Sequence, residues 1–466
     1  MNVPVVPLVV ATALFMETMD SSLLSTALPT IARDLGVDPI ALKLAITAYL
    51  VALAMFIPVS GWVADKFGAK STFRAALAVY MLASVGCATA TSLEGFVVWR
   101  FVQGMGGALM VPVGRLVIVR AIPKGELVRA MSFLTLPSLL GPVTGPLIAG
   151  FLATYADWRW IFLVNLPVGL LGIMLATIYF NDDRQEAGPL DVKGFALSSI
   201  ALPGIVLGAA LAGQRVAQPW VAATCAIVGL TAAVLYLRHA GTSPRPLLDL
   251  RLLSLQTFDA GVVGGTLFRI GIGAAAFLMP LMLQLGFGLD PLTSGFITFA
   301  GALGALAMKT MAPALLRRFG FRPILIWSGL LASAALAATA MFTPSTPHLS
   351  MSAVLLAAGL ARSLQFSSLN AIAYADVTPD RISAATSLSS VAQQVSLSLG
   401  VAIGAVILEA SAAIGGRVTP GAADFSNTLM AMGALSSLAV FRMRQLPPNA
   451  GQNLSGAALR GGDAER

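Results

Sequence analysis

The sequence predicts an all-α, polytopic membrane protein with about fourteen transmembrane helices. Three observations predict it: few charged residues, a series of long apolar segments, and Lys and Arg gathered on alternate connections. Charged residues make up 11% of the 466 residues and hydrophobic residues 57%, whereas a soluble globular protein carries about 25% charged residues. A chain of this composition lacks the charged surface that water requires, so lipid is the solvent that it fits.

The apolar segments have the length of bilayer-spanning helices, which need about 20 residues each. Lipid cannot satisfy exposed backbone groups, so spanning segments are helices or strands of a closed barrel. Uninterrupted apolar runs of this length exclude the alternating strands of a barrel. The expected spans, in order, are 5–31, 41–64, 72–92, 95–119, 127–153, 158–180, 194–213, 220–238, 256–285, 292–315, 322–342, 349–375, 382–410 and 425–442.

Lys and Arg lie mainly on one side of the expected membrane. If the N-terminus is cytoplasmic, the even-numbered connections and the C-terminal tail hold nineteen of them and the opposite connections only five. Because basic loops remain in the cytoplasm, we expect both termini there, in a plasma (bacterial inner) membrane. The net charge of +8 is spread through short loops, which argues against a nucleic-acid partner.

Two short loops repeat one pattern at equivalent places. Residues 64–70 read Ala-Asp-Lys-Phe-Gly-Ala-Lys, and residues 316–322 read Leu-Arg-Arg-Phe-Gly-Phe-Arg. Each loop follows the second span of a six-helix half if spans seven and eight are an insertion. Arg100 and Arg362 then both fall in the fourth span of their half. We expect an N-terminal bundle over 1–180, an inserted hairpin over 181–250, a C-terminal bundle over 251–444 and a disordered cytoplasmic tail over 445–466. Two such halves around a site are typical of secondary transporters.

Five motifs resemble a known family. Residues 61–74, Gly-Trp-Val-Ala-Asp-Lys-Phe-Gly-Ala-Lys-Ser-Thr-Phe-Arg, resemble the loop between the second and third spans of the major facilitator superfamily. Residues 100–108 (Arg-Phe-Val-Gln-Gly-Met-Gly-Gly-Ala) resemble its fourth-span motif, and 141–150 (Gly-Pro-Val-Thr-Gly-Pro-Leu-Ile-Ala-Gly) its fifth-span antiporter motif. Residues 19–32 and 157–169 resemble signatures of its fourteen-span drug:proton antiporter branch. In the C-terminal half the resemblance rests only on the Phe-Gly loop and the span count.

The resemblance implies the major facilitator fold, with two six-helix bundles and two extra central helices. It also implies proton-driven export of amphipathic small molecules by alternating access. The fifth-span motif is associated with exchangers rather than symporters. The residues that the resemblance assigns to conformational switching are Gly61, Asp65, Gly68, Lys70, Arg74, Gly141, Pro142, Gly145, Pro146 and Gly150.

Two acids lie deep in the first span. A charge at mid-membrane costs about 2.5–3.5 kcal/mol on insertion scales, so intramembrane charges are functional candidates. Glu17 lies ~18 Å into the span at 1.5 Å per residue, and Asp20, three residues on, shares its face. A carboxylate can release and rebind a proton, whereas an arginine keeps its charge. We expect Asp20, and next Glu17, to carry the proton, with Arg100 as the partner of the ionised acid. The alternative is a structural ion pair that locks spans one and four.

The C-terminal half contains deep basic residues instead. Arg269, Lys309 and Arg362 lie inside expected spans. Their excess over deep acids favours anionic or zwitterionic substrates, although Lys309 could simply pair with Asp259. The residues that we expect to line the substrate cavity are Arg269, Arg362, Gln103, Gln284, Gln365 and Asn370.

Other function classes fit the sequence less well. A membrane-embedded enzyme would need clustered His, Asp or Glu near one interface, and we expect both histidines in loops. Asymmetric midplane charges and a two-halved repeat argue against a symmetric channel. We therefore expect no catalytic residues, no metal site and no cofactor, the proton gradient being the energy source. The expected partners are small amphipathic substrates, protons and lipids. A dedicated exporter or flippase of one metabolite, lipid or peptide stays the alternative, and a periplasmic adaptor stays open.

Overall fold

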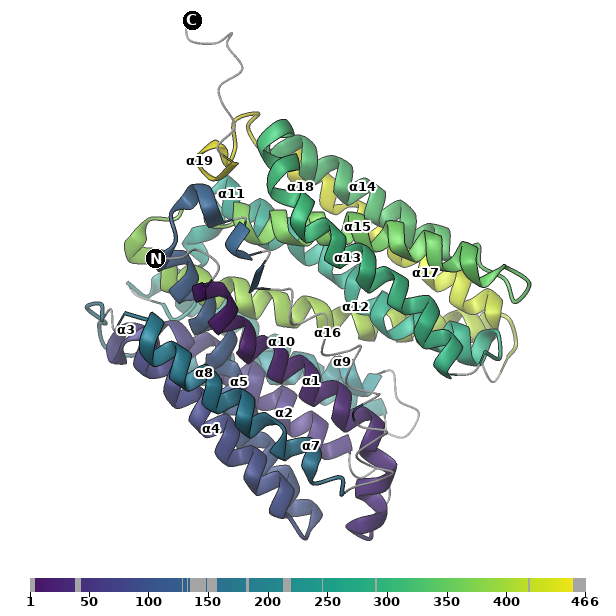
Figure 1. The fold of residues 1–466 in the computed structure, drawn as a ribbon, viewed down its shortest axis with the longest axis horizontal. Helices are drawn as coiled ribbons and strands as arrows, with labels where there is room; N and C mark the ends of the chain where they lie inside the picture. Colours follow the sequence, from purple (N-terminus) through teal and green to yellow (C-terminus); the bar gives the residue numbers. More distant parts are fainter. Residues whose placement is uncertain are drawn as a thin grey trace, which may run out of the picture. The chain divides into compact units, whose positions relative to one another are not determined.

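The computed structural model describes residues 5–37, 43–127, 129–131, 133–134, 148, 157–181, 184–212, 219–244, 246–289, 291–417 and 420–455. Every regular element within these ranges is a helix (Figure 1), in agreement with the predicted all-α class. The chain divides into two compact units. The first comprises residues 1–121, 133–250 and 378–406, and the second comprises residues 122–132, 251–377 and 407–466.

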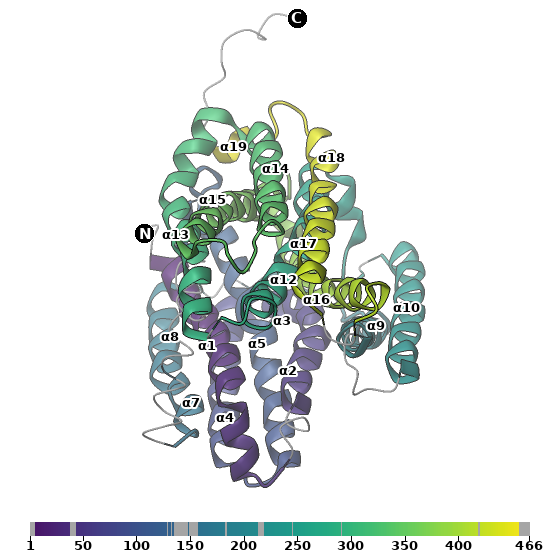
Figure 2. The ribbon, with the colours of Figure 1, turned by 90° about the vertical axis from the view of Figure 1, so that its right-hand side faces the viewer.

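The first unit contains long helices from the N-terminal half and the inserted hairpin. Helix α4 packs against both α5 and α8, and α9 packs against both α10 and α2 (Figure 2). The elements of this unit are α1 (Val5–Asp34), α2 (Lys43–Phe56), η1 (Ile57–Val59), α3 (Ser60–Phe67), α4 (Ala69–Thr89), α5 (Leu93–Ala121), α7 (Trp160–Leu163), α8 (Asn165–Tyr179), α9 (Val192–Ala212), α10 (Pro219–Thr242), η6 (Pro379–Arg381) and the first part of α16 (Ile382–Ile414).

The second unit contains the remaining helices of the C-terminal half. Helix α13 packs along α15, and α14 packs against both α15 and α17. Its elements are η2 (Lys124–Glu126), most of η3 (Leu250–Ser254), α11 (Gln256–Asp259), η4 (Ala260–Gly264), α12 (Gly265–Leu281), η5 (Met282–Gly286), α13 (Pro291–Phe319), α14 (Phe321–Thr339), α15 (His348–Ile372), the end of α16, α17 (Ala422–Ser437), α18 (Ala439–Arg444) and α19 (Gln452–Ser455).

Ten helical segments of the described residues are long and apolar enough to cross a membrane. They are Leu44–Phe67, Ala69–Thr89, Leu93–Ala121, Trp160–Tyr179, Trp220–Thr242, Gln256–Gly286, Thr293–Phe319, Phe321–Thr339, His348–Ile372 and Pro379–Ile414. Three further expected spans coincide with α1, with α9, and with α17 and α18. The expected span 127–153 falls largely outside the described residues. The count of fourteen therefore stays a prediction.

The two Phe-Gly loops each have a positive φ at their glycine. Gly68 has a φ of 89° between α3 and α4, and Gly320 has a φ of 77° between α13 and α14. Both angles lie in the region that glycine adopts without the steric cost that a Cβ atom brings. In each loop the glycine ends one helix and the next helix starts at the following residue. The repeat seen in the sequence is therefore also a repeat of structure.

Glycines of the fourth-span motif bring α5 close to its neighbours. A Cβ atom at Gly104 would lie 2.6 Å from the carbonyl oxygen of Tyr49 in α2, and one at Gly106 would lie 2.8 Å from the backbone nitrogen of Tyr80 in α4. Such small residues allow membrane helices to approach backbone to backbone. This packing places the polar side chains of α5 beside those of the helices around it.

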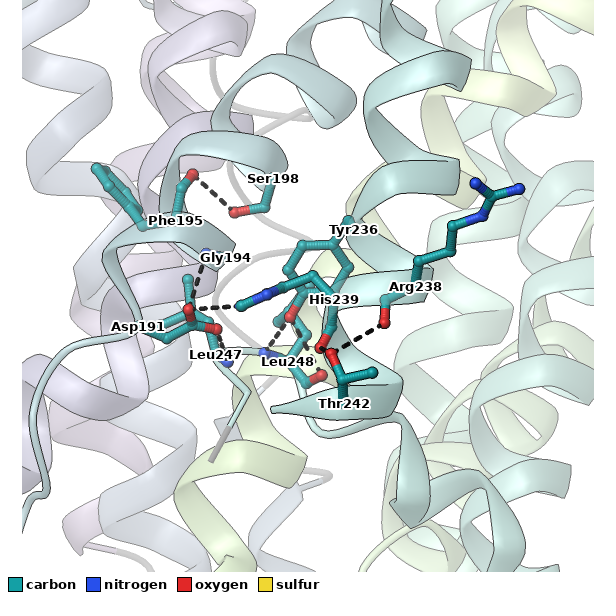
Figure 3. Close-up of polar contacts among 10 residues, drawn as sticks. All are labelled: Asp191, Gly194, Phe195, Ser198, Tyr236, Arg238, His239, Thr242, Leu247 and Leu248. Atoms are coloured by element: carbon teal, nitrogen blue, oxygen red, sulfur yellow. Dashed lines mark hydrogen bonds and ion pairs between the residues drawn. The ribbon is translucent and has the colours of Figure 1, made fainter. Parts of the chain in front are cut away.

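Hydrogen bonds join the inserted hairpin to Leu247 and Leu248, in the segment that follows it (Figure 3). The Asp191 carboxylate accepts hydrogen bonds from the backbone of Gly194 (2.8 Å) and of Leu247 (3.2 Å), and it lies 2.7 Å from Nε2 of His239. The Tyr236 hydroxyl accepts a bond from the Leu248 backbone nitrogen (2.6 Å) and lies 3.2 Å from the Leu248 carbonyl oxygen. We call these six residues the hairpin clasp. The clasp fixes the chain just before it enters the second unit.

Candidate functional site

A buried ion pair joins the first and fourth expected spans. Arg100 of α5 donates from Nη1 to Oδ2 of Asp20 in α1, at 2.6 Å. The side chains are 2% and 1% exposed, respectively. The pair that the sequence predicts is therefore present and shielded from solvent.

Neutral polar groups complete the surroundings of the pair. Gln103 of α5 accepts from Arg100 Nη1 (2.6 Å) and donates from Nε2 to Asp20 Oδ1 (3.2 Å) and to Ser84 of α4 (2.9 Å). Asn165 of α8 donates to Asp20 Oδ1 at 3.4 Å. Four helices thus contribute to one network around Asp20, which we call the Asp20 network.

An aromatic ring covers the arginine. The guanidinium carbon of Arg100 lies 4.6 Å from the centre of the Tyr49 ring in α2, a favourable cation–π distance. Gln103, which we expected in a substrate cavity, belongs to this network. Asn165 lies within the motif 157–169 but was not assigned a role from the sequence, and Ser84 gave no signal at all. Both depend on contacts between distant segments.

Glu17 lies one turn before Asp20 on α1. Its side chain is half-buried, and it accepts no hydrogen bond from the residues that the structure describes. Arg115 and Asp20 are close enough to act on it electrostatically. Arg115 itself donates to Gln393 in the first part of α16, at 2.9 Å. Glu17 is thus a second acid near the Asp20 network that lacks the direct arginine contact of Asp20.

The loop residues expected to act in conformational switching contact the start of α16. Asp65 accepts from Arg120 Nη2 at 2.6 Å and from the hydroxyl of Ser383. The backbone nitrogen of Gly61 donates to Ser387 at 3.0 Å. The Asp65 carboxylate therefore lies at the N-terminus of α16, where negative charge is favoured. Lys70 is half-buried and Arg74 is exposed.

Gly141, Pro142, Gly145, Pro146 and Gly150 of the fifth-span motif are outside the described residues.

Two of the expected cavity residues of the second unit contact each other, since Arg269 Nη2 donates to Asn370 at 3.0 Å. Gln365 contacts a different residue and accepts a hydrogen bond from Ser328 at 2.5 Å. Arg362 and Gln284 are half-buried.

The alternative pairing of Lys309 with Asp259 is wrong. Lys309 Nζ donates to the Ser367 hydroxyl at 2.7 Å, and Asp259 instead lies 3.5 Å from Arg442 Nη1. Asp259 ends the short helix α11, whereas Lys309 lies deep in α13. Two side chains at the same end of neighbouring helices meet only if both helices turn them toward each other. The sequence does not give the rotation of a helix about its axis, so the pairing could not be predicted from it.

Comparison with known proteins decides the family. A family model described as the Major Facilitator Superfamily matches residues 10–401 and 261–460. The chain belongs to the major facilitator superfamily. The probable transport protein HsrA of Haemophilus influenzae is 36% identical over 400 residues, which is 86% of each chain. The putative multidrug resistance protein MdtD of Pectobacterium atrosepticum is 36% identical over 402 residues, again 86% of each. MdtD of Salmonella paratyphi A is 37% identical over 406 residues, 86% of this chain and 85% of that one.

Solved structures share the fold. The proton:xylose symporter XylE superposes with a TM-score of 0.68 at 15% identity, over 97% of this chain and 98% of that chain. The human organic anion transporter MFSD10 gives a TM-score of 0.66 at 16% identity, over 95% and 100%. At this identity the likeness concerns the fold alone. Family and relatives together make this chain a multi-pass membrane transporter of the superfamily and not an enzyme.

Proposed function

We propose that this transporter is a proton-coupled exporter of amphipathic small molecules that works by alternating access, with Asp20 as its proton carrier. The observation that carries the proposal is the buried pair of Asp20 and Arg100 between α1 and α5. A carboxylate inside a membrane protein is retained at a cost, and it is a group that can exchange a proton during a transport cycle. The fourteen-span drug:proton antiporter branch is the part of the superfamily that the motifs support.

The Asp20 network supplies a way to couple a proton to helix packing. While Asp20 is ionised, Arg100 holds α5 to α1 through the 2.6 Å contact. A proton on Asp20 removes the negative charge, so the attraction to Arg100 weakens. Gln103 can still accept from Arg100, which keeps the guanidinium hydrogen-bonded while the ion pair opens. Glu17, on the same helix face, is the second proton-carrying candidate.

Asp65 and Gly61 are proposed as part of the conformational switch. Their contacts with Ser383 and Ser387 at the start of α16 are polar and small, and such contacts can form and break without disturbing a packed core. The names of the relatives support small amphipathic substrates, because two of them are called multidrug resistance proteins. A dedicated exporter or flippase of one metabolite, lipid or peptide is the second candidate, supported by the relative named only as a transport protein.

The proposed location and topology of the protein rest on the sequence. We propose a bacterial inner membrane location, fourteen spans, both termini in the cytoplasm, and the proton gradient as the energy source with no bound cofactor. Lipids surround the exposed apolar faces of helices such as α10 and α14.

Proton movement in inside-out vesicles tests the function. A pH gradient is set, and cationic, neutral and anionic amphipaths are added to vesicles that contain wild-type protein or Asp20→Asn. We expect at least one compound to discharge the gradient in wild type and not in the variant, because asparagine cannot carry the proton. Equal discharge in both would remove Asp20 from the mechanism and direct attention to Glu17. No discharge by any compound in wild type would favour the dedicated exporter.

A further inference from the structure

One face of α15 in the second unit includes a basic residue, Arg362, and is contacted by a second one, Arg269 of α12. Arg362, Phe366 and Asn370 recur every four residues, so they lie on one face of the helix. Arg269 of α12 contacts this face. Its Nη2 donates to Asn370 Oδ1 at 3.0 Å, and its guanidinium carbon lies 5.6 Å from the centre of the Phe366 ring.

The neighbouring face of α15 receives a third basic residue. Ser363 and Ser367 lie one turn apart and both contact α13. The Ser363 hydroxyl donates to the carbonyl oxygen of Ala305 at 2.8 Å, and Lys309 donates from Nζ to the Ser367 hydroxyl at 2.7 Å. Arg269 and Lys309 therefore contact α15 within the stretch Arg362–Asn370, whose first residue is itself basic. We call Arg269, Lys309 and Arg362 the α15 basic cluster.

Lys309 and Arg362 do not have the charge partner that Arg100 has in the first unit. Lys309 is 6% exposed, and Arg269 is fully buried. Among the described residues, the ion pairs of the second unit are Arg442–Asp259 and Arg417–Asp424. Neither Lys309 nor Arg362 forms an ion pair with a described carboxylate, and the Ser367 hydroxyl is neutral.

This arrangement is unfavourable unless an anion offsets it. An ammonium buried with a single hydroxyl partner has lost water without gaining an opposite charge. Cations that gather on one helix also repel one another. Charges kept inside a membrane protein under such conditions mark a substrate or ion pathway. The chemistry of the cluster is that of an anion site: guanidinium groups bind carboxylates through paired hydrogen bonds, and lysine adds a compact positive charge.

We propose that the α15 basic cluster binds the carboxylate or sulfonate of an amphipathic anion, with the Phe366 ring against its apolar part. The proposal rests on the export function above and names the substrate class of that function. Lys309 and Arg362 supply the charge that the anion needs, and Arg269 holds Asn370 and Phe366 in place. A neutral ester of the same compound gains nothing from the cluster.

Matched compounds and variants test the proposal. Transport into inside-out vesicles is measured for a dansyl carboxylate, its methyl ester and a dansyl quaternary ammonium. The proteins compared are wild type, Lys309→Gln, Arg362→Gln and the charge-retaining Lys309→Arg. Arg318→Gln is the control, because Arg318 is an exposed basic residue of the same helix, α13. We expect Lys309→Gln and Arg362→Gln to raise the KM for the carboxylate about thirtyfold or more, as loss of a buried charged contact does. The ester should be unaffected, and Lys309→Arg should restore much of the difference.

A binding measurement on detergent-solubilised protein separates this proposal from the export function. The Kd of the dansyl carboxylate is read from its fluorescence, without any proton gradient. Weaker binding in Lys309→Gln, with unchanged binding in Arg318→Gln, supports the anion site even if no vesicle transport is seen. Equal binding by wild type and Lys309→Gln, or no binding to wild type, overturns it. So does a KM that rises equally for carboxylate and ester. Gradient discharge by the quaternary ammonium alone overturns the anion site and leaves proton-coupled export standing.

Discussion

Asp20 and Arg100 stabilise each other because each is the counter-charge of the other inside the first unit. Both are almost fully buried, and Gln103 and Asn165 add hydrogen bonds to the carboxylate. Removing one partner of such a pair leaves the other buried and uncompensated, which costs more than the pair itself contributes. The two residues should therefore be tested together as well as singly.

We expect Arg100→Leu to lower the free energy of unfolding by about 3–5 kcal/mol. Asp20→Asn should cost less, because asparagine can still accept from Gln103 and Arg100. The double variant should be more stable than Arg100→Leu alone, since the uncompensated carboxylate is gone, and the difference gives the coupling energy. Denaturant unfolding of the detergent-solubilised protein measures all four. Purely additive losses would show that the pair is not an energetic unit.

At the scale of single residues, the sequence predicted the charged pair but not the polar residues that surround it. Charges in an apolar segment stand out by themselves, so Asp20 and Arg100 could be chosen and paired. Ser84 and Asn165 are ordinary residues whose role arises only when α4 and α8 pack beside α1. The pairing of Lys309 with Asp259 failed for the same reason, because the facing of each helix depends on packing. The structure instead placed Lys309 against Ser367.

The α9–α10 hairpin shows how an element outside the two predicted bundles is held. Burial alone would raise the pKa of Asp191, but hydrogen bonds from Gly194, His239 and Leu247 outweigh it and hold the pKa below its ordinary value of 3.8. A carboxyl group with a lowered pKa stabilises the folded state above its ordinary pKa and loses that contribution as pH falls through the lowered value. The hairpin clasp should therefore be intact at neutral pH and fail only in strong acid.

Asp191→Asn should loosen the clasp. Asparagine has nearly the same shape as aspartate but lacks the negative charge that strengthens the hydrogen bonds from Gly194, His239 and Leu247. We therefore expect the local stability of the clasp to fall by about 1–2 kcal/mol. Hydrogen exchange of the Leu247 amide, which donates to Asp191, should become about tenfold faster or more. Glu186→Gln is the control, because Glu186 is an exposed acid in the segment before the same hairpin. An unchanged exchange rate at Leu247 in Asp191→Asn would show that the carboxylate does not hold the segment.

The positions of the helices along the chain were easier to predict than the contacts between helices. The length of the apolar segments predicted the spans. The two Phe-Gly loops predicted a repeat, and the positive φ angles of Gly68 and Gly320 confirm it. The sequence did not reveal that Asp65 would meet Ser383 or that Leu247 would meet Asp191. Those contacts join segments far apart in the chain, and no local pattern encodes them.

For the whole molecule, composition and motifs were enough to predict the superfamily that the comparisons show. The units differ in charge arrangement. The first unit holds a balanced pair, Asp20 with Arg100, and the second holds the α15 basic cluster. In the proposed proton-coupled export of anions, Asp20 would exchange the proton and the α15 basic cluster would bind the charge of the substrate.

Proton release on substrate binding tests the central claim most directly. Detergent-solubilised protein in weakly buffered solution is mixed with a compound that discharges the gradient in vesicles, and a pH indicator reports protons. If the substrate and the proton exclude each other through Asp20, wild type releases protons on binding, Asp20→Asn releases none, and the Glu186→Gln control matches wild type. Proton release from Asp20→Asn equal to that of wild type would contradict the account.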